Sequence, residues 1–275
     1  TEIIPDSSEA IGSDGGYKNA PATESNSSSE VYSDTNNQVK GVQEADIIKT
    51  DGRYIYACGY ALKGIVYYPN FSTTGIDASQ SRVYILSADN GKLNLVSTIQ
   101  FRSEQNNVKY ALKEILLYEN TLVLIKEGYS YDNETANYYN YKDYYYNNYY
   151  YMRSASNTTA VEIYDITDKS NPVFKNELYQ SGFCNSSRMI GKYLYIISTY
   201  SVYNPDVNAP ETYIPFCSPY NKKNLMPADC IVVPDTVSSN NYNVITGLDV
   251  TKPDNFKSKA ATLGFGGTIY ASERN

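Results

Sequence analysis

The chain has 275 residues, enough for one large domain with a substantial core. It contains 31 Tyr but no Trp and no His, and 23 Lys and Arg against 30 Asp and Glu give a formal charge of -7. The lack of His excludes His-based acid–base chemistry, Ser-His-Asp triads and His-ligated metals. The acidic balance disfavours nucleic acid as a partner. No apolar run approaches the roughly 18 residues of a membrane helix, so we expect no membrane span.

The N-terminal segment differs in composition from the rest of the chain. Residues 1–45 hold eight carboxylates and two lysines, which leaves the remaining 230 residues nearly neutral. Residues 1–38 are rich in Ser, Asn, Gly, Thr and acids and show no period of 2 or 3.6. Such a segment cannot bury enough apolar area to offset the entropy of ordering it, so we expect a disordered linker. A linker before a folded body suits tethering to a cell surface, although an ordinary disordered terminus has the same composition.

One unit recurs three times along the body of the chain. Each copy begins with a short apolar strand, a tight turn and a strand of β-branched and aromatic residues, which is the pattern of a hairpin. The tight turns fall at Asp51-Gly52, Glu119-Asn120 and Gly191-Lys192. A second hairpin follows in each copy, at 82–99, 160–178 and 242–263. Because repeated four-stranded antiparallel units are the blades of a β-propeller, we expect an all-β β-propeller. A sandwich or open barrel also has regularly spaced short strands, but neither requires the same unit three times in one order.

The spacing of the units places the expected blades at about 46–101, 112–180 and 186–264. Residues 268–275 resemble the first strand of a next blade. A propeller needs about four blades or more to close, so we expect residues 39–275 to be a partial β-propeller, the N-terminal part of a larger one. Uncovered blade faces and strand edges in such a structure would favour self-association.

Long insertions interrupt all three units between the second and third strands, at about 60–80, 128–158 and 199–241. In a four-stranded meander these connections leave from the same end of the strands. We therefore expect the insertions to decorate one face of the propeller, around one mouth of its channel. Long loops in compact domains frequently carry binding, so this face is the predicted contact surface.

The second insertion has an extreme composition, with 11 Tyr between residues 129 and 151. Tyr combines a large apolar ring with a hydroxyl and few rotatable bonds, which suits a binding surface for sugars or peptides. The same tract is also typical of drifting low-complexity sequence, or of strands that extend the hairpin. The candidate ligand-binding residues are Tyr139, Tyr141, Tyr144, Tyr145, Tyr146, Tyr149 and Tyr150.

Cysteines and acids provide the other candidates. An even number of cysteines in a protein of suspected extracellular origin favours disulfides, and we expect a Cys217–Cys230 bridge within the third insertion. The pairing of Cys58 and Cys184 stays open. Glu44 and Asp46, near the first strand, are candidate metal ligands, although turn formation and ion pairs explain such acids equally well. We expect no metal and no other cofactor, and no motif identifies a catalytic pair of carboxylates.

The string GVQEADIIKTDG at 41–52, followed by RYIYA, resembles the opening motif of a family of secreted bacterial and archaeal β-propeller proteins, usually written GVDEADIVKTDGKYIY. The resemblance extends over about residues 39–275, and IYDITDKSNPVF from Ile163 is similar to LVIVD-type propeller repeats. Gln43 departs from the usual Asp, which argues against a multi-carboxylate metal site in the motif. The resemblance implies a secreted or cell-surface β-propeller and brings no assigned activity.

These observations favour a binding or adhesion module that is secreted or at the cell surface and contacts an unidentified extracellular glycan or protein through its insertions. One alternative is an enzyme acting on polysaccharide or peptide with carboxylates at the channel mouth. Another is a purely structural scaffold in a multidomain surface protein.

Overall fold

The computed structural model describes residues 41–68, 71–105, 108–130, 157–202, 205–219, 224–237 and 239–264, all within the unit Tyr32–Asn275. For 60–68, 71–80, 105, 129, 130 and 157 it describes the backbone alone. The predicted linker at 1–38 and the predicted strand at 268–275 lie outside these ranges. Within them the chain forms β-strands and two short 3-10 helices and no α-helix, and none of its helices is long and apolar enough to cross a membrane.

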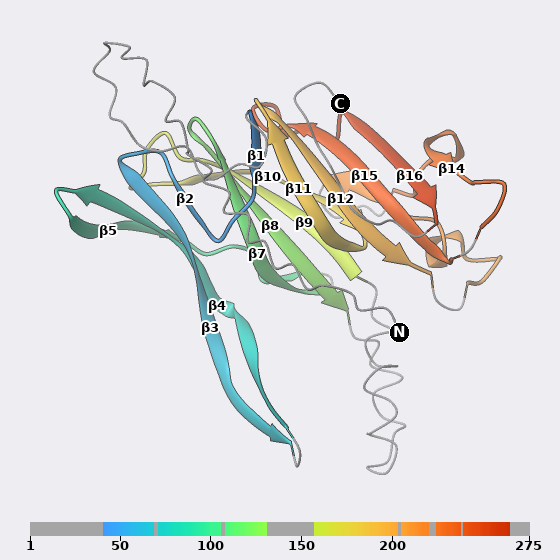
Figure 1. Ribbon diagram of the computed structural model, residues 1–275, viewed down its shortest axis with the longest axis horizontal. Coiled ribbons are helices and arrows are strands. Elements are labelled where there is room, and N and C mark those ends of the chain that lie inside the picture. Colours follow the sequence, from blue (N-terminus) through green and yellow to red (C-terminus); the bar gives the residue numbers. More distant parts are fainter. Residues whose placement is uncertain are drawn as a thin grey trace, which may run out of the picture. The chain divides into compact units, whose positions relative to one another are not determined.

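Three antiparallel sheets follow one another along the chain (Figure 1). Blade 1 consists of β2 (Ile48–Thr50), β3 (Tyr54–Tyr68), β4 (Phe71–Asp89) and β5 (Lys92–Ile99). Blade 2 consists of β7 (Val108–Tyr118), β8 (Thr121–Ser130), β9 (Asn157–Asp165) and β10 (Val173–Ser181). Blade 3 consists of β11 (Phe183–Ile190), β12 (Tyr193–Ser201), β15 (Asn241–Asp249) and β16 (Ser258–Leu263). In each blade the four strands pair in chain order, so the predicted all-β propeller architecture is confirmed.

Four short strands add to the edges of the sheets that contain blades 2 and 3. β1 (Val42–Glu44) pairs with β11 and β6 (Glu104–Gln105) with β7, each on the first strand of a blade. β13 (Cys217–Pro219) and β14 (Ile231–Val232) pair with the last strands, β10 and β16. The 3-10 helices η1 (Pro210–Thr212) and η2 (Ala228–Cys230) lie in the same insertion as β13 and β14. Strands of two or three residues carry no period of their own, which is why the sequence did not predict them.

The tight turns form where the sequence predicts them. Asn90 and Gly91, with φ of 48° and 77°, connect β4 to β5 as a two-residue loop in which both residues have positive φ. Glu119 and Gly191 also have positive φ, 49° and 54°, and each opens a two-residue loop between the first two strands of its blade. Positive φ at these positions matches the twist of the flanking strands, so each turn fixes the register of its hairpin.

One backbone hydrogen bond repeats in all three blades. Its donor is an amide near the end of the third strand, and its acceptor is a carbonyl in the turn between the first and second strands. The bonds are Ala88 N to Arg53 O (2.9 Å), Ile166 N to Asn120 O (2.8 Å) and Val250 N to Lys192 O (3.0 Å). This contact fixes which residues are equivalent. Counting from it, for example, Tyr56, Val123 and Tyr195 occupy the same position in successive blades.

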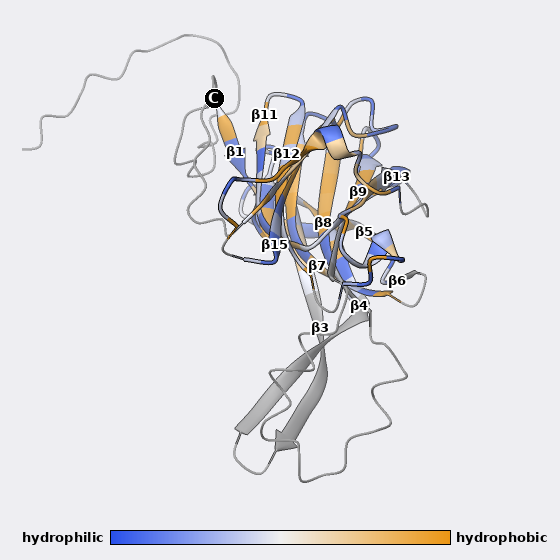
Figure 2. Ribbon diagram, turned by 90° about the vertical axis from the view of Figure 1, so that its right-hand side faces the viewer, coloured by the Kyte–Doolittle hydropathy of each residue, from blue (hydrophilic) through white to orange (hydrophobic). Residues whose placement is uncertain are grey.

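The core lies between the blades. One apolar cluster joins blade 1 to blade 2 and includes Tyr56, Val83, Ile115, Leu122 and Leu124. A second joins the other face of blade 2 to blade 3, and Figure 2 shows hydrophobic residues running along β8 and β9 in the middle blade. Because adjacent strand residues point to opposite faces, nearly continuous apolar runs in β8 and β9 serve both clusters.

The connection between blades 2 and 3 is held by a buried polar network. Gly182 follows β10 with φ of 93°, and a Cβ atom there would lie 2.4 Å from the carbonyl oxygen of Thr199. Thr159 Oγ1 donates to the Gly182 carbonyl at 2.7 Å, and Gln180 Nε2 donates to Ser198 Oγ at 2.8 Å. A residue with a side chain cannot occupy position 182 without moving this connection.

Candidate functional site

The long connections leave each blade from the end opposite to its tight turns. In every blade the first-to-second and third-to-fourth connections lie at one end, which we call the turn end. The second-to-third connections, which hold the three predicted insertions, leave from the other end, which we call the insertion end. The antiparallel pairing within each sheet requires this separation.

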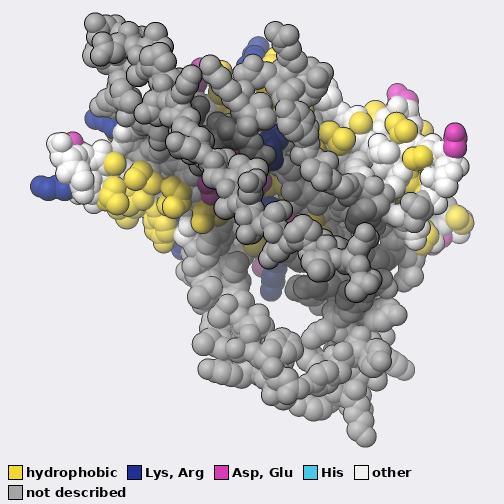
Figure 3. All heavy atoms as spheres, in the orientation of Figure 1, with side chains coloured by type: hydrophobic (Ala, Val, Ile, Leu, Met, Phe, Trp, Pro, Cys, Tyr) yellow, Lys and Arg dark blue, Asp and Glu magenta, His cyan; other side chains and the backbone are white. Residues whose placement is uncertain are grey.

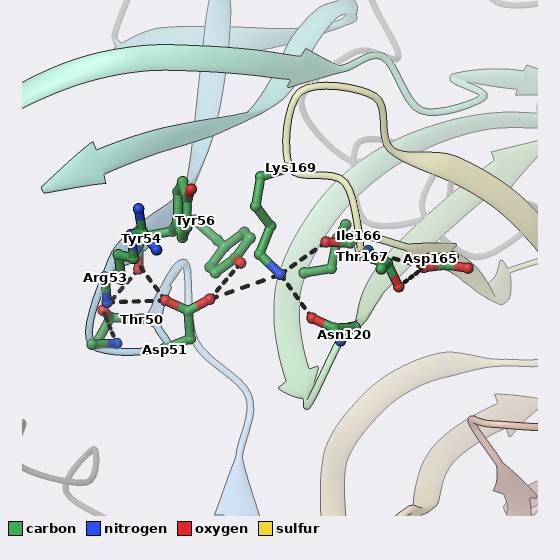
Figure 4. Close-up of polar contacts among 11 residues, drawn as sticks. Thr50, Asp51, Arg53, Tyr54, Tyr56, Asn120, Asp165, Ile166, Thr167 and Lys169 are labelled. Carbon is green, nitrogen blue, oxygen red and sulfur yellow. Dashed lines mark hydrogen bonds and ion pairs between the residues drawn. The ribbon is translucent and has the colours of Figure 1, made fainter. Parts of the chain in front are cut away.

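Lys169 ties the turn ends of blades 1 and 2 together (Figure 4). Its ammonium donates to Asn120 Oδ1 at 3.0 Å and to the Ile166 carbonyl at 2.8 Å, both in blade 2. It also lies 4.0 Å from the Asp51 carboxylate in the first turn of blade 1. Asp51 accepts bonds from the amide of Tyr54 and the hydroxyl of Tyr56, so it is a turn-forming residue. The two turn ends therefore face the same way, and so do the two insertion ends.

The insertion of blade 1 is a hairpin arm. β3 and β4 continue past Gly59 and Arg82 as a two-stranded ribbon, whose last pair is Tyr68 with Phe71. β2 pairs only with 55–57 and β5 only with 83–89, so among the described strands none pairs with the arm. The insertion thus projects from the blade as an extension of its own strands.

The Tyr-rich insertion of blade 2 begins and ends at neighbouring positions of one hairpin. Tyr129 on β8 pairs with Asn157 on β9, and this is the last pair of that hairpin. The seven candidate tyrosines, Tyr139, Tyr141, Tyr144, Tyr145, Tyr146, Tyr149 and Tyr150, lie outside the described residues. Their predicted role in binding stays a prediction.

The insertion of blade 3 is anchored on two blades. β13 adds to the last strand of blade 2, with Cys217 opposite Gln180, and β14 adds in parallel to the last strand of blade 3. Between these strands Met226 packs with Val244 and Ala261. Tyr200 stacks on Tyr242 with ring centroids 6.3 Å apart, and its hydroxyl donates to the Thr212 carbonyl. This insertion therefore presents an ordered surface at the insertion end.

The predicted Cys217–Cys230 disulfide is wrong, since none of the four cysteines forms one. Cys217 is buried in the apolar cluster of Met226 and Val244, and Cys230 packs against the same cluster. Burial raises the pKa of the Cys217 thiol to about 12, which keeps it protonated and unreactive. Strand pairing at both ends of the insertion closes the loop without a covalent bond.

The opening motif joins all three blades. Gln43 in β1 pairs with Met189 of blade 3, and its side-chain oxygen accepts the Leu117 amide of blade 2 at 3.0 Å. Asp46 exchanges two backbone bonds with Ile115 of blade 2, and β2 then starts blade 1. The chain from 42 to 50 therefore pairs with the first strand of blade 3, then with that of blade 2, and then forms the first strand of blade 1.

The candidate metal ligands in this motif have protein partners. Glu44 Oε1 lies 3.2 Å from Arg188 Nη2, and the buried Lys49 ammonium donates to the Glu44 carbonyl. Asp46 Oδ1 accepts the Ile47 amide at 2.6 Å. In the part of the chain that the structure describes, no three His, Cys, Asp or Glu side chains are grouped as a metal site requires. The arrangement of Glu44 and Asp46 fits a structural role in the opening motif.

Sequence reasoning missed a buried ionic cluster in blade 2. The Lys126 ammonium lies 2.5 Å from both Glu162 Oε1 and Glu177 Oε1, and all three side chains are fully buried. It also donates to the Arg102 carbonyl at 2.9 Å and lies over the Tyr110 ring. The signal that could have found the cluster is a charged residue at an inward-facing position in each of three consecutive strands, at Lys126, Glu162 and Glu177.

This cluster does not form a glycosidase site. Glu162 and Glu177 are directly opposite each other on β9 and β10, but Lys126 lies between their carboxylates and no solvent reaches them. A second cation, Arg102, lies 3.7 Å from Glu177 Oε2. Burial raises the pKa of Glu177, and the Tyr164 hydroxyl donates to Glu162 Oε2 at 2.8 Å. The chemistry available to such a network is structural: it fixes the alignment of three strands.

The blades, their order and their interfaces define the chain as a β-propeller protein. A family model described as a β-propeller domain matches residues 32–275. The chain belongs to this β-propeller domain family. No curated protein and no solved structure matches it.

Proposed function

We propose that the chain is a secreted or cell-surface binding module whose blade insertions contact an extracellular glycan or protein. One observation carries the proposal: all three insertions, including the hairpin arm of blade 1, leave from the insertion ends, whereas the turn ends carry connections of eight residues or fewer. Binding residues concentrate in long loops that a rigid scaffold positions. The extracellular location is supported by the resemblance of residues 41–52 to the opening motif of secreted propeller proteins.

The sheet itself suggests how to remove the candidate binding loop. Because β8 and β9 stay paired up to Tyr129 and Asn157, residues 130–156 can be replaced by an Asn-Gly turn. We expect the shortened protein to keep its β-sheet circular dichroism and thermal midpoint, and to lose at least about tenfold in affinity for any ligand found on glycan or peptide arrays. The triple substitution of Tyr144, Tyr145 and Tyr146 by Ala should have the same effect.

A matched control places the same chemical change at the turn end. Tyr118→Ala removes a half-buried tyrosine next to the first turn of blade 2, and it should leave ligand affinity unchanged. If the wild-type protein binds nothing on either array, or if binding survives the loop replacement at full strength, the insertions are not the contact surface.

A further inference from the structure

The linker between blades 1 and 2 is held on blade 2 through both backbone groups of Arg102. This linker joins β5 to β7, and the structure describes it through residue 105. The Arg102 amide donates to Glu162 Oε1 at 2.9 Å, and the Arg102 carbonyl accepts a hydrogen bond from the Lys126 ammonium, also at 2.9 Å. The preceding residue, Phe101, is buried. Two members of the buried ionic cluster therefore fix the linker directly.

The third member of the cluster, Glu177, has two differently placed carboxylate oxygens. Its Oε1 lies 2.5 Å from the Lys126 ammonium. Its Oε2 is buried and has no hydrogen-bond partner in the described part of the chain, and the Arg102 guanidinium lies 3.7 Å from it. The same guanidinium lies 4.6 Å from the centre of the Phe174 ring. Because the Arg102 side chain is 42% exposed and that of Glu177 is fully buried, this contact connects the cluster to the surface.

The charge of the cluster depends on whether Glu177 carries a proton. Burial and the Glu162 carboxylate raise the pKa of Glu177, against the opposing effect of Lys126. With Lys126 and Glu162 both charged, an ionised Glu177 gives the three buried side chains a net charge of -1, whereas a protonated Glu177 leaves them neutral. Burial raises the pKa values of the neighbouring tyrosines, which therefore stay neutral. The titratable and charged groups that face Glu177 are Arg102 in the linker, Tyr110 on β7, Lys126 on β8, Glu162 and Tyr164 on β9 and Tyr179 on β10.

We propose that Glu177 and Arg102 form a proton-controlled latch on the linker between blades 1 and 2. When Glu177 is ionised, the negative charge of the cluster attracts the Arg102 guanidinium and holds the linker more tightly on blade 2. When Glu177 takes up a proton, the buried cluster is neutral without Arg102. The linker then keeps the two backbone bonds of Arg102 but loses the attraction of its side chain.

The latch adjoins the base of the Tyr-rich insertion. In the linker, Glu104 of β6 pairs with Lys109 of β7, and Lys109 pairs in turn with Tyr129 of β8. Tyr129 is the residue at which that insertion leaves the sheet. The latch does not depend on the proposed function, but it makes the support of this insertion sensitive to pH.

Carbon NMR of the glutamate carboxyl groups measures the first half of the latch. The signal that disappears in Glu177→Gln belongs to Glu177, and its titration gives the pKa. Arg102→Gln should raise that pKa by at least about half a unit, because it removes an opposite charge that favours the carboxylate. Lys192→Gln is the matched control: it removes a 39% exposed cation from the buried Asp249 of blade 3, 3.0 Å away, and should leave the pKa of Glu177 unchanged.

Amide hydrogen exchange of residues 102–105, corrected for the intrinsic rate at each pH, measures the second half. In the wild type these amides should be about twofold to fivefold better protected above the pKa of Glu177 than below it, as expected for a partly exposed ion pair. Glu177→Gln and Arg102→Gln should lose this pH dependence, whereas Lys192→Gln should keep it.

The direction of the change separates the latch from global unfolding. Ionisation of a carboxyl group whose pKa is raised by folding makes the whole fold less stable, so better protection of the linker at higher pH cannot come from global stability. Circular dichroism should show that all variants are folded. The proposal is overturned if the pKa of Glu177 is unchanged in Arg102→Gln, if linker protection in the wild type does not rise with pH, or if the rise persists in Glu177→Gln.

Discussion

Lys126 occupies a position where the strand pattern calls for an apolar side chain. Leu122 and Leu124 precede it on the same face of β8, and all three are fully buried. Two carboxylates, Glu162 and Glu177, compensate its charge, and Tyr110 and Phe101 place their rings 4.9 Å and 5.9 Å from its ammonium. A buried ion pair of this kind adds little net stability, but removing one member leaves an uncompensated charge in a low-dielectric site.

We expect Lys126→Met to destabilise the protein by about 3–5 kcal/mol, because it leaves two buried carboxylates with only the partly exposed Arg102, 3.7 Å from Glu177, as a cation. Replacing Glu162 and Glu177 by Gln as well should recover much of that loss, since no charge then remains unpaired. Urea unfolding at neutral pH measures both effects. Equal stability of the single and the triple variant would contradict this account.

The same cluster gives a pH dependence with a definite sign. Burial raises the pKa of Glu177 above its ordinary value of 4.5, so the folded state holds that proton more tightly than the unfolded state does. Stability therefore falls as the pH rises from about 4.5 through the raised pKa. The Glu177→Gln variant lacks this titrating carboxyl group. The unfolding free energy of the wild type should therefore fall relative to that of the variant across this pH range, and the difference should level off above it.

Tyrosine has a structural use in the blades that the composition does not reveal. In each blade a Tyr ring lies over a glycine on the neighbouring strand, and a Cβ atom on that glycine would meet the ring. The pairs are Tyr84 over Gly59, Tyr110 over Gly128 and Tyr195 over Gly247. The ring supplies the packing that the glycine lacks. Abundant tyrosine is thus no measure of binding by itself.

At the scale of elements, the opening motif is a clasp between blades. Val42 is buried in β1, and the segment through Asp46 adds backbone bonds to blades 3 and 2. We expect deletion of residues 1–40 to leave the thermal midpoint unchanged. Deletion through Asp46 should remove about 2 kcal/mol from Val42 alone and lower the midpoint by about 4–8 °C. Calorimetry of the two truncations measures this, and an equal midpoint in both would show that the clasp carries no stability.

The sequence predicts the hairpins and their order because their signals are local. Asn90-Gly91 requires positive φ, and the alternation around it places Val83 and Ile85 on one face. β1 and β13 could not be predicted, since each pairs with a strand more than 35 residues away and has no period of its own. The same limit explains why the disulfide prediction was wrong. Cys217 and Cys230 are close in sequence, but the sequence did not reveal that apolar packing and strand pairing already close that insertion.

At the scale of the whole molecule, the three described blades differ in how much of their surface is covered. Blade 2 packs on a neighbour with both faces, whereas blades 1 and 3 each carry exposed apolar side chains, such as Leu95 and Ile245, on the face away from blade 2. Figure 3 shows hydrophobic side chains gathered over the sheet of blade 1, at the left. Local opening costs least where the fewest apolar contacts break. Amide hydrogen exchange should therefore be slowest in β8 and β9 and faster in β2, β5 and β16.

The opposite outcome is equally informative. Equal protection of all three described blades would mean that the blades open together as one cooperative unit, with blade 2 no more stable than its neighbours.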